Sequence, residues 1–312
     1  MIETGKPVHV VINPRSGYGG QKRLLGELRR EIRQAGWEVV EYVTQAVADA
    51  TRYAKSIAPQ ASAVIAWGGD GTVNEVANGL ADTNVPLLAV RAGTENLLAK
   101  ELSIPKRPAD LVGLLKSGEI MACDIGMING LSFHSILGVG FDAEVVRRVS
   151  RTRTGHISHL SYFWPIWRTF WEHNFPRLLV QADGETIFQG QGLVFVGNIS
   201  RYSSGLRICR DARFDDGLLD LVVFECDQQA RLLLHAAWTL LRLHPLKGNV
   251  IYRQARRIRV ESDKPVHCQL DGDLGPTTPL DISISPRKIK LIVPGSPPGW
   301  PGPFWPWKGA PV

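Results

Sequence analysis

Three short loops in the first hundred residues carry residue types that are suited to binding phosphate. They are Asn13-Pro14-Arg15-Ser16-Gly17, Gly68-Gly69-Asp70-Gly71-Thr72 and Gly93-Thr94-Glu95-Asn96, and we name them the three glycine loops. Glycines let backbone N–H groups approach phosphate oxygens, and a helix start adds about half a positive charge. Hydroxyls such as Ser16 and Thr72 can donate without bringing charge, and Arg15 could bridge two phosphates. Together the loops predict a triphosphate site, although the G-x-x-x-x-G-K-[ST] motif of a P-loop is absent from the sequence.

Asp70 is the one carboxylate within the second glycine loop. It would repel a phosphate unless a cation lay between them, so we interpret it as a direct or indirect contact to Mg²⁺. Taken alone, the first loop is an ordinary turn, and Thr94 or Asn96 could simply cap a helix. The order of the loops, with Asn74 and Glu75 following the second, favours the phosphate interpretation.

An acidic turn, Gln269-Leu270-Asp271-Gly272-Asp273, lies far downstream. Asp-Gly is first of all a turn dipeptide. Phosphoryl transfer to a hydroxyl, however, needs a carboxylate near the acceptor oxygen to take its proton. If the turn faces the glycine loops, we expect Asp271 to be that base. Asp273 could instead be the base, or could orient Mg²⁺ or a water, and the sequence does not decide between them.

Alternating strands and helices would bring the three glycine loops together. Short apolar segments at 8–12, 39–43, 63–67 and 87–90 read as strands, and apolar residues at helical spacing follow each of them. Such β-α repeats predict a parallel sheet covered on both faces. Because ligands of such sheets bind beyond the carboxyl ends of the strands, we expect the loops that follow the strands to converge there.

The pattern changes to antiparallel β-structure near residue 121. Asn129-Gly130 and Asp183-Gly184 are hairpin-turn dipeptides between apolar segments, and further strands are expected at 218–224, 258–261, 267–270, 280–285 and 289–293. One long helix near 228–243 interrupts them, and its apolar residues favour a core helix, with a membrane anchor as the alternative. We therefore predict a nucleotide-binding α/β domain over 1–125, a mainly antiparallel β-sandwich over 126–293 and a Pro/Trp-rich tail over 294–312.

Composition narrows the possible partners and compartments. The formal net charge of +6 implies an anionic partner: a nucleotide, a nucleic acid or an acidic membrane. No segment reaches the eighteen apolar residues of a membrane span, and the N-terminus lacks the apolar region of a secretory signal, so we expect a cytoplasmic protein. The four cysteines lack metal or disulfide spacing. Arg253, Arg256, Arg257 and Arg259 fit a solvated strand face, so we expect no nucleic-acid partner.

These residues resemble a known family. VINPRSG (11–17), GGDGTVNEVANGL (68–80), GTENLLAKEL (93–102), DIG (124–126), GVGFDAEVV (138–146), FDDGLLDLVVF (214–224) and QLDGD (269–273) occur in the order found in soluble bacterial diacylglycerol kinases, which are similar to eukaryotic sphingosine and ceramide kinases. The resemblance implies a first domain like that of NAD kinases and phosphofructokinases, followed by a β-sandwich.

The resemblance also implies ligand-binding residues. For ATP they are Asn13, Pro14, Arg15, Ser16, Gly17, Thr44, Gly69, Asp70, Gly71, Thr72, Val73, Asn74, Glu75 and Thr94. Asp124 would join Asp70 in an acidic network near the active-site Mg²⁺. A structural cation would lie near Asp216, with the carbonyls of Arg213 and Leu218.

Two motifs depart from the family pattern. Glu95 and Leu97 replace the small and acidic residues that commonly follow the fourth strand, and Asp273 replaces a glutamate. Glu95 could alter which polar head group is accepted. The shorter Asp273 favours Asp271 as the base.

A lipid substrate would require docking on a membrane surface. Residues 162–175 contain three Trp, and Trp300, Trp305 and Trp307 lie in the tail. Trp favours the membrane interface, and Arg147, Arg148, Arg151 and Arg153 could contact anionic lipid. Alternatively, the aromatic residues of 162–175 pack between the two domains.

The leading hypothesis is an ATP- and Mg²⁺-dependent lipid kinase that is cytoplasmic and peripherally bound to membranes. It would convert diacylglycerol to phosphatidic acid, although a sphingoid base, ceramide or phosphatidylglycerol also offers a hydroxyl. The alternatives are a soluble kinase acting on NAD and a catalytically inactive nucleotide-binding regulator. The sequence does not indicate the oligomeric state.

Overall fold

The first domain is a parallel sheet whose strands end at the glycine loops. The computed structural model describes residues 2, 5–16, 21–151, 163–203 and 206–295. Strands β1 (Val8–Ile12), β2 (Val39–Val43), β3 (Ala63–Trp67) and β4 (Leu87–Ala89) are parallel in the order β2-β1-β3-β4. Every residue of β1 and β3 is buried, as expected for parallel strands covered on both faces.

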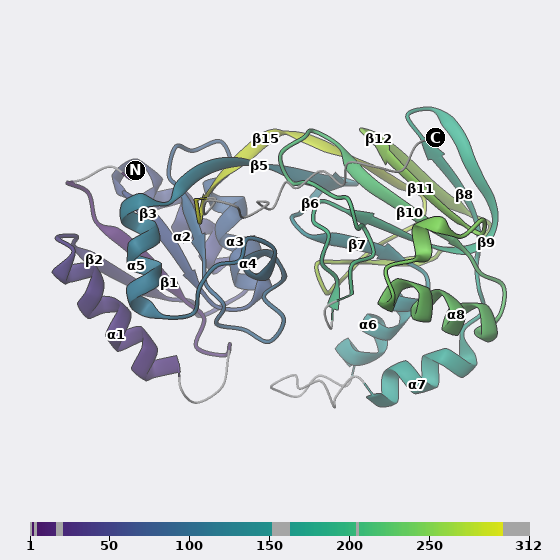
Figure 1. Cartoon of the computed structure of the whole chain (residues 1–312), viewed down its shortest axis with the longest axis horizontal. Coiled ribbons are helices and arrows are strands. Elements are labelled where there is room, and N and C mark those ends of the chain that lie inside the picture. The colour runs from purple at the N-terminus through teal and green to yellow at the C-terminus, as the bar shows by residue number, and fades with distance from the viewer. Residues whose placement is uncertain (1, 3–4, 17–20, 152–162, 204–205, 296–312) are drawn as a thin grey trace.

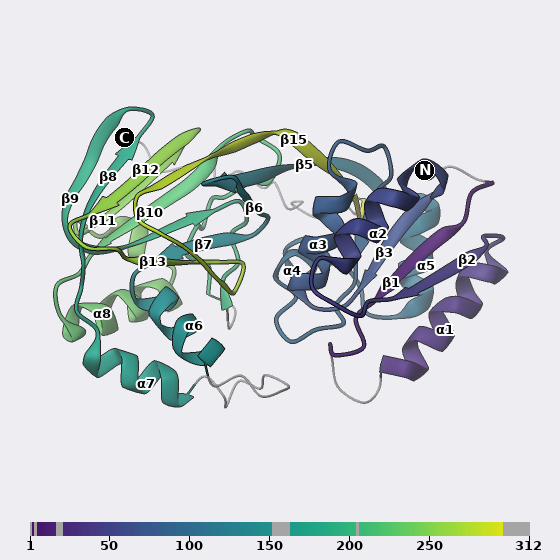
Figure 2. The same cartoon turned by 180° about the vertical axis from the view of Figure 1, so that it is seen from behind.

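Helices cover both faces of this sheet. They are α1 (Gln21–Gln34), α2 (Asp49–Ile57), α3 (Asp70–Leu80), the short α4 (Leu97–Glu101) and α5 (Pro108–Ser117), with a 3₁₀ turn, η1 (Ala58–Gln60), after α2. Helices α1 and α5 lie on the near face in Figure 1, and α2 and α3 lie on the near face in Figure 2. The predicted strands 8–12, 39–43 and 63–67 match the observed ones. Each is a five-residue segment rich in β-branched or aromatic residues, which favours a strand over a helix.

The second domain is antiparallel. Its strands are β6 (Leu131–Phe133), β7 (Ile136–Val139), β8 (Arg177–Ala182), β9 (Glu185–Gly197), β10 (Leu219–Glu225), β11 (Val250–Ala255), β12 (Arg257–Ser262), β13 (His267–Leu270) and β14 (Asp273–Thr277). The first half of β9 pairs with β8 and its second half with β7 and β10, so this strand passes from one sheet to the other. The core between the sheets includes Phe133, Val196 and Leu221. The predicted fold class, an α/β domain followed by a mainly antiparallel β-sandwich, is confirmed.

Two long strands join the domains. β5 (Glu119–Ile128) and β15 (Leu280–Val293) pair antiparallel, and Figure 1 shows both passing from one domain to the other along the top of the molecule. The segments expected as two strands, 280–285 and 289–293, are one strand with a register shift between Ile284 and Lys288. The last residues of β15 pack in the core of the first domain, where Leu291 pairs with Leu87. The predicted domain boundary at residue 125 falls inside β5. Residues 289–293, which were predicted to belong to the sandwich, pack in the first domain.

Three helices and a turn lie on the second domain: α6 (Phe141–Arg151), α7 (Phe163–Glu172), α8 (Gln229–Leu240) and the 3₁₀ turn η4 (His244–Leu246). The expectation that residues 228–243 form a core helix is wrong. The buried residues of α8 are His235 and Thr239, while most of its leucines face outward. Of the described helices, none combines the length and apolar character needed to cross a membrane.

Candidate active site

The three glycine loops meet at the carboxyl ends of the parallel strands. The side-chain amide of Asn13 donates to Thr72 Oγ1 (3.1 Å), and Gly69 N donates to Ser16 Oγ (3.2 Å). These contacts join the first loop to the second, which starts helix α3. Gly17 lies outside the described residues.

The second and third loops approach each other more closely than side chains would permit. A Cβ added to Gly93 would lie 2.3 Å from Gly69 Cα, well inside van der Waals contact. Asn96 fixes the third loop by accepting a hydrogen bond from Gly93 N (2.7 Å) and donating one to Gly93 O (2.8 Å). Glycine at position 93 is therefore what allows the two backbones to form one wall, whereas a Cβ on Gly69 would make only ordinary contacts (3.6 Å and longer).

Asp70 caps a helix in this arrangement. Its carboxylate accepts hydrogen bonds from the backbone N–H groups of Asn96 (2.8 Å) and Leu97 (2.6 Å) at the start of α4. Burial raises the pKa of Asp70, and the backbone donors oppose that rise. Because each oxygen already accepts a backbone donor, this placement favours an indirect contact to a metal ion, through water, over a direct one.

Most of the other residues predicted for nucleotide binding also line this region. Asn13, Pro14, Arg15, Ser16, Thr44, Gly69, Asp70, Gly71, Thr72, Glu75 and Thr94 line one large cavity. Glu75 accepts hydrogen bonds from Ala48 N (3.0 Å) and Ala50 N (3.1 Å) at the start of α2, so its carboxylate has a structural task. Val73 is buried in the core of the first domain, and its side chain does not line the cavity.

The distal acidic turn reaches the first domain through Asn74. The Asn74 amide donates to Asp271 Oδ2 (2.9 Å), across 197 positions of the chain. Asp271 also accepts from the backbone N–H groups of His134 (2.8 Å), Ser135 (2.8 Å) and Ile136 (2.9 Å). The turn and the glycine loops thus face each other, as the kinase hypothesis requires.

The two aspartates of the turn have different surroundings. Asp271 accepts four donors on two oxygens, which fills the lone-pair positions of a carboxylate. Burial raises its pKa to about 6, against the lowering effect of those backbone donors. Asp273 is exposed and lines the cavity. This arrangement argues against the preference for Asp271 as the base: Asp271 is suited to holding the turn, and Asp273 to meeting a substrate.

The cavity continues from the glycine loops into the second domain. Its volume is about 1470 Å³, above the roughly 300–1,000 Å³ typical of small-molecule sites. Its far part is lined by apolar side chains, which we name the apolar chamber: Ile136, Leu193, Phe195, Ile208, Phe224 and Leu232. The inner side of α8 closes the chamber with His235, Ala236 and Thr239. One cavity therefore joins a polar part and an apolar part.

Asp142 is a cavity residue whose role the sequence did not indicate. It lies in the first turn of α6, is buried, and accepts a hydrogen bond from the hydroxyl of Tyr202 (3.3 Å). Burial raises its pKa to about 6. An acidic residue in the first turn of a helix, shortly after a glycine, is common, as in Gly140-Phe141-Asp142. The sequence pattern around Asp142 therefore did not distinguish a cavity residue from a helix cap.

Asp124 lies away from the cavity, so its predicted contact to active-site Mg²⁺ needs correction. Its buried carboxylate forms an ion pair with Lys288 Nζ (2.8 Å) and accepts a hydrogen bond from Gly217 N (2.7 Å). β5 carries Asp124 toward the β15 side of the molecule, beside the loop that precedes β10. Asp124 therefore stabilises that loop.

The residues predicted for a structural cation lie on the same loop. Asp216 accepts a hydrogen bond from Leu218 N (3.0 Å), and Arg213 pairs with Asp215 (3.3 Å). Within the described residues, no group of three acidic, His or Cys side chains is arranged to hold a metal ion. Lys288 already supplies a positive charge beside Asp124 and Asp215, and the structural cation stays a prediction.

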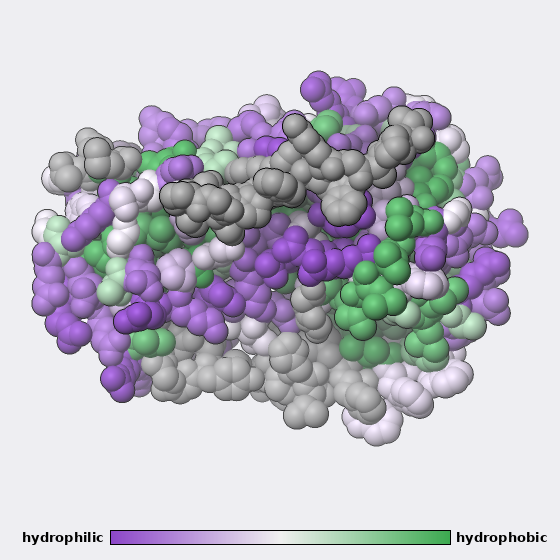
Figure 3. Space-filling view, in the orientation of Figure 1, coloured by the Kyte–Doolittle hydropathy of each residue, from purple (hydrophilic) through white to green (hydrophobic). Residues whose placement is uncertain are grey.

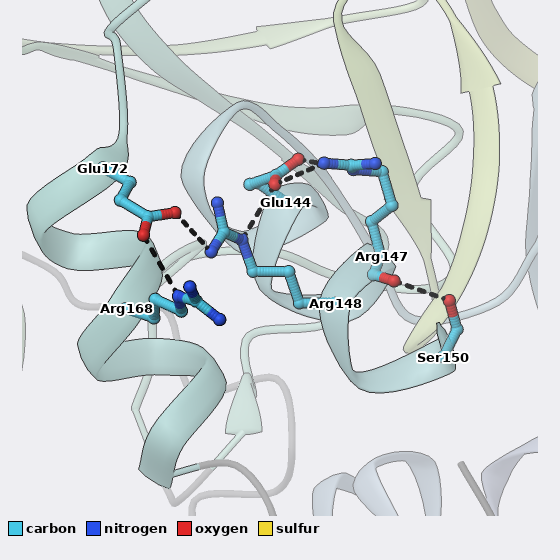
Figure 4. A network of polar contacts seen from close by, with 6 residues as sticks. All are labelled: Glu144, Arg147, Arg148, Ser150, Arg168 and Glu172. Carbon is cyan, nitrogen blue, oxygen red and sulfur yellow. Dashed lines mark hydrogen bonds and ion pairs between the residues drawn. The ribbon is translucent and has the colours of Figure 1, made fainter. Parts of the chain in front are cut away.

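The arginines expected to contact anionic lipid are engaged in ion pairs. Figure 4 shows Glu144 between Arg147 and Arg148 on α6, and Arg148 reaching Glu172 on α7. The distances are 2.7 Å, 2.9 Å and 2.7 Å. The Arg148–Glu172 pair joins α6 to α7, and Arg147 pairs with Glu144 within α6, so both arginines have carboxylate partners inside the protein. The Arg151 side chain and Arg153 lie outside the described residues.

The aromatic segment on α7 faces solvent. At least half of the surface of each of its tryptophans is exposed: 71% for Trp164, 50% for Trp167 and 61% for Trp171. Packing between the domains, the alternative for 162–175, therefore does not apply to these side chains. Trp300, Trp305 and Trp307 lie outside the described residues.

Comparison with known proteins gives matches over both domains. The family model of the diacylglycerol kinase catalytic domain matches residues 7–128. The model of the YegS C-terminal NAD kinase beta sandwich-like domain matches residues 135–293.

Individual relatives match over nearly the full chain. A diacylglycerol kinase of Bacillus subtilis (strain 168) is 29% identical over 297 residues, which cover 93% of this chain and 97% of that protein. A diacylglycerol kinase of Mycobacterium tuberculosis (strain H37Rv) is 30% identical over 299 residues, which cover 94% of this chain and 96% of that protein. The crystal structure of a diacylglycerol kinase from Bacillus anthracis str. Sterne has a TM-score of 0.71 at 21% identity, covering 93% of this chain and 98% of that one.

Proposed function

We propose, on the premise that this chain belongs to the diacylglycerol kinase family, that it transfers the γ-phosphoryl group of ATP to the hydroxyl of diacylglycerol, giving phosphatidic acid. The single observation that carries the proposal is the continuous cavity. It joins the glycine loops, the acidic turn and the apolar chamber, so one site can hold a triphosphate beside a lipid hydroxyl. Its substrate would lie in a membrane, so peripheral association with an anionic membrane is part of the proposal.

The polar part of the cavity suits a nucleotide triphosphate. The start of α3 presents the backbone N–H groups after Gly69, and Ser16 and Thr94 add hydroxyls nearby. Arg15 is the basic side chain among the first-loop residues that line the cavity. Acidic residues also face this space, so we expect Mg²⁺ to be held mainly by the phosphates and, through water, by Asp70. When bound, the ion would neutralise charge on the transferred group.

Asp273 is our candidate for the general base. It lines the cavity next to the glycine loops, and it is exposed to an incoming substrate. Asp271 would act as a positioning residue, because its four hydrogen bonds tie the turn both to Asn74 on α3 and to the backbone of residues 134–136. The base would remove the hydroxyl proton as the acceptor oxygen attacks the γ-phosphorus, and the bond from that phosphorus to the β–γ bridging oxygen would break to release ADP.

The apolar chamber supports a lipid acceptor over NAD. Its side chains are aliphatic or aromatic, and a dinucleotide would leave many of its polar atoms without partners there. Acyl chains, by contrast, gain free energy from leaving water for such surroundings. The hydroxyl of a diacylglycerol would then lie at the boundary between the two parts of the cavity, near Asp273.

The direct test is product identification. The purified chain is incubated with γ-labelled ATP, Mg²⁺ and one acceptor at a time: diacylglycerol in mixed micelles, a sphingoid base, ceramide or NAD. We expect labelled phosphatidic acid as the main product, identified by mass. Labelling of NAD alone, or ATP binding without transfer to any acceptor, would contradict the proposal.

A second test addresses the chamber. Ala236→Trp places a large side chain on the chamber side of α8, and Ala237→Trp, on the neighbouring position outside the cavity lining, is the matched control. In mixed micelles we expect the first variant to lose about tenfold or more in kcat/KM for long-chain diacylglycerol, and less for short-chain substrate. Equal effects of the two variants would show that the chamber does not hold the acyl chains.

A further inference from the structure

Helix α8 is amphipathic in the reverse sense of a normal surface helix. Its buried positions are polar, since His235 donates from Nε2 to Glu225 O (2.9 Å) and Thr239 lines the cavity. Its exposed positions are apolar: three leucines (Leu233, Leu234 and Leu240) and three alanines. An ordinary surface helix buries its apolar stripe and exposes its polar one, so this helix leaves apolar surface in water at a cost.

The exposed leucines form one patch with the turn that follows the helix. Leu233, Leu234, Leu240, Leu241, Leu243 and Leu246 are all more than one-third exposed, and Leu240 and Leu246 reach 71%; we name these six the leucine patch. Figure 3 shows apolar surface gathered in this region, over α8 and η4 of Figure 1. Single exposed leucines need no explanation, but a contiguous group of this size marks an interaction surface.

The residues around the patch indicate what covers it. The segment 228–247 contains no acidic residue and carries Arg231, Arg242 and Lys247. Arg231 is paired with Glu225 (3.6 Å) and Asp227 (3.5 Å) just before the helix, so Arg242 and Lys247 form the basic rim of the patch. Lys247 Nζ lies 3.7 Å from the ring centroid of Trp238, which pairs a cation with an indole beside the leucines. Leucine, tryptophan and basic side chains together are the composition of a helix that lies in the interface of an anionic bilayer.

A second copy of the chain fits this surface less well. In a symmetric dimer the same patch would meet itself, which would bring its basic rim against an identical basic rim. An anionic bilayer complements both the leucines and that rim. The exposed Trp side chains of α7, whose end contacts α8 where Gln229 donates to His173 O (3.4 Å), extend the apolar surface at the same end of the domain.

We propose that the leucine patch is the membrane-insertion surface of this protein, and that α8 lies in the interface of an anionic bilayer with its leucines among the acyl chains. The opposite side of α8 lines the apolar chamber, so an inserted helix separates the bilayer from the chamber by one helix thickness. The proposal rests on the proposed function only for why a membrane is needed, because the substrate is found there.

The test is flotation of the full chain with vesicles of phosphatidylcholine, with and without phosphatidylglycerol. We compare the wild type, Leu240→Gln, the triple variant Leu233→Gln/Leu240→Gln/Leu241→Gln, and the control Leu131→Gln, an exposed leucine (52%) on the β5–β6 hairpin. We expect the vesicle-bound to free ratio to fall several-fold for the single variant and about tenfold or more for the triple variant, with no change for the control. The altered side chains are exposed, so thermal unfolding temperatures should stay close to that of the wild type.

Activity measurements separate this proposal from the proposed function. With short-chain diacylglycerol below its micellar concentration, the triple variant should keep its kcat/KM within about twofold, while activity on vesicle-embedded substrate falls with binding. Flotation needs no catalysis, so it tests the patch even if no lipid is phosphorylated. Unchanged flotation of the triple variant would overturn the proposal while leaving the kinase assignment intact. A wild-type dimer that the triple variant abolishes in sedimentation velocity would assign the patch to a protein contact and also overturn it.

Discussion

The two sides of the cavity are built on opposite principles. On the first-domain side, short loops are fixed by backbone geometry, as where Gly93 approaches Gly69 and Asp70 caps α4. On the second-domain side, apolar side chains, the buried carboxylate Asp142 and the partly buried Asp271 define the space. We conclude that substitutions which move the backbone should impair nucleotide binding most. The choice of acceptor should instead depend on which side chains line the second-domain part of the cavity.

The sharpest test of this contrast lies within the acidic turn. We expect Asp273→Asn to lower kcat by about 10²- to 10⁴-fold, the usual contribution of a general base, with little change in unfolding temperature because Asp273 is exposed. Steady-state kinetics and thermal unfolding measure the two effects.

Asp271→Asn is the companion variant. An amide at this position would turn its NH₂ toward a backbone N–H, so we expect a loss of about 1–3 kcal/mol in unfolding free energy together with reduced turnover. If instead Asp271→Asn alone abolished turnover at unchanged stability, and Asp273→Asn were active, the assignment of the base would be reversed.

The next effect in size concerns the backbone wall. Gly93→Ala would place its Cβ 2.3 Å from Gly69 Cα, so the second and third loops must separate. We expect ATP affinity to fall about tenfold or more, measured by calorimetry. Gly113→Ala in α5, where the added Cβ meets nothing within 4 Å, is the control and should leave binding unchanged and stability equal or slightly higher. Similar losses in both variants would count against a special role for the close approach.

A pH-dependent difference should appear on the second-domain side. The pKa of Asp142 is raised to about 6 in the folded protein, above its value in the unfolded chain, so its ionisation destabilises the fold as pH rises from about 4 to about 6. The unfolding free energy of Asp142→Asn, relative to that of the wild type, should therefore rise by up to about 3 kcal/mol across that range. Above that range the difference between the two proteins should stay constant. Urea unfolding of both proteins at several pH values measures this difference. The other titrating groups contribute equally to both proteins, so their effects cancel. A difference that does not change with pH would show that Asp142 ionises normally.

The smallest effect is expected from one hydroxyl. Ser16→Ala removes the acceptor for Gly69 N, and we expect ATP affinity to fall roughly 2- to 10-fold. Ser56→Ala, which removes a hydroxyl that bonds within α2, should leave affinity unchanged. A loss above a hundredfold would mean that Ser16 does more than orient the loop.

The sequence predicted the first side of the cavity better than the second. Family membership and fold class are confirmed, and the three glycine loops converge because parallel strands end at one edge of a sheet. Both hairpin dipeptides take left-handed backbone conformations, with Asn129 at φ 46° and Asp183 at φ 47°. These features depend on local residue types, so they can be read from short segments.

What the sequence did not predict depends on residues far apart in the chain. Helix α8 carries four leucines and three alanines among its twelve residues, and such an apolar composition normally indicates burial, so the outward orientation of its leucines could not be read from the sequence. The sequence favoured Asp271 as the base, but the backbone N–H groups of residues 134–136, which lie far from it in the chain, occupy its oxygens. Asp124 was assigned by resemblance, and its pairing with Lys288 requires the β5–β15 register.

That register has a consequence for biosynthesis. Residues 289–293 of β15 complete the first domain, packing beside β4 and along β5. During synthesis on the ribosome, the edge strand β4 of the amino-terminal domain would therefore lack its neighbour until almost the whole polypeptide has emerged. Both halves should then acquire their final structure together rather than one after the other.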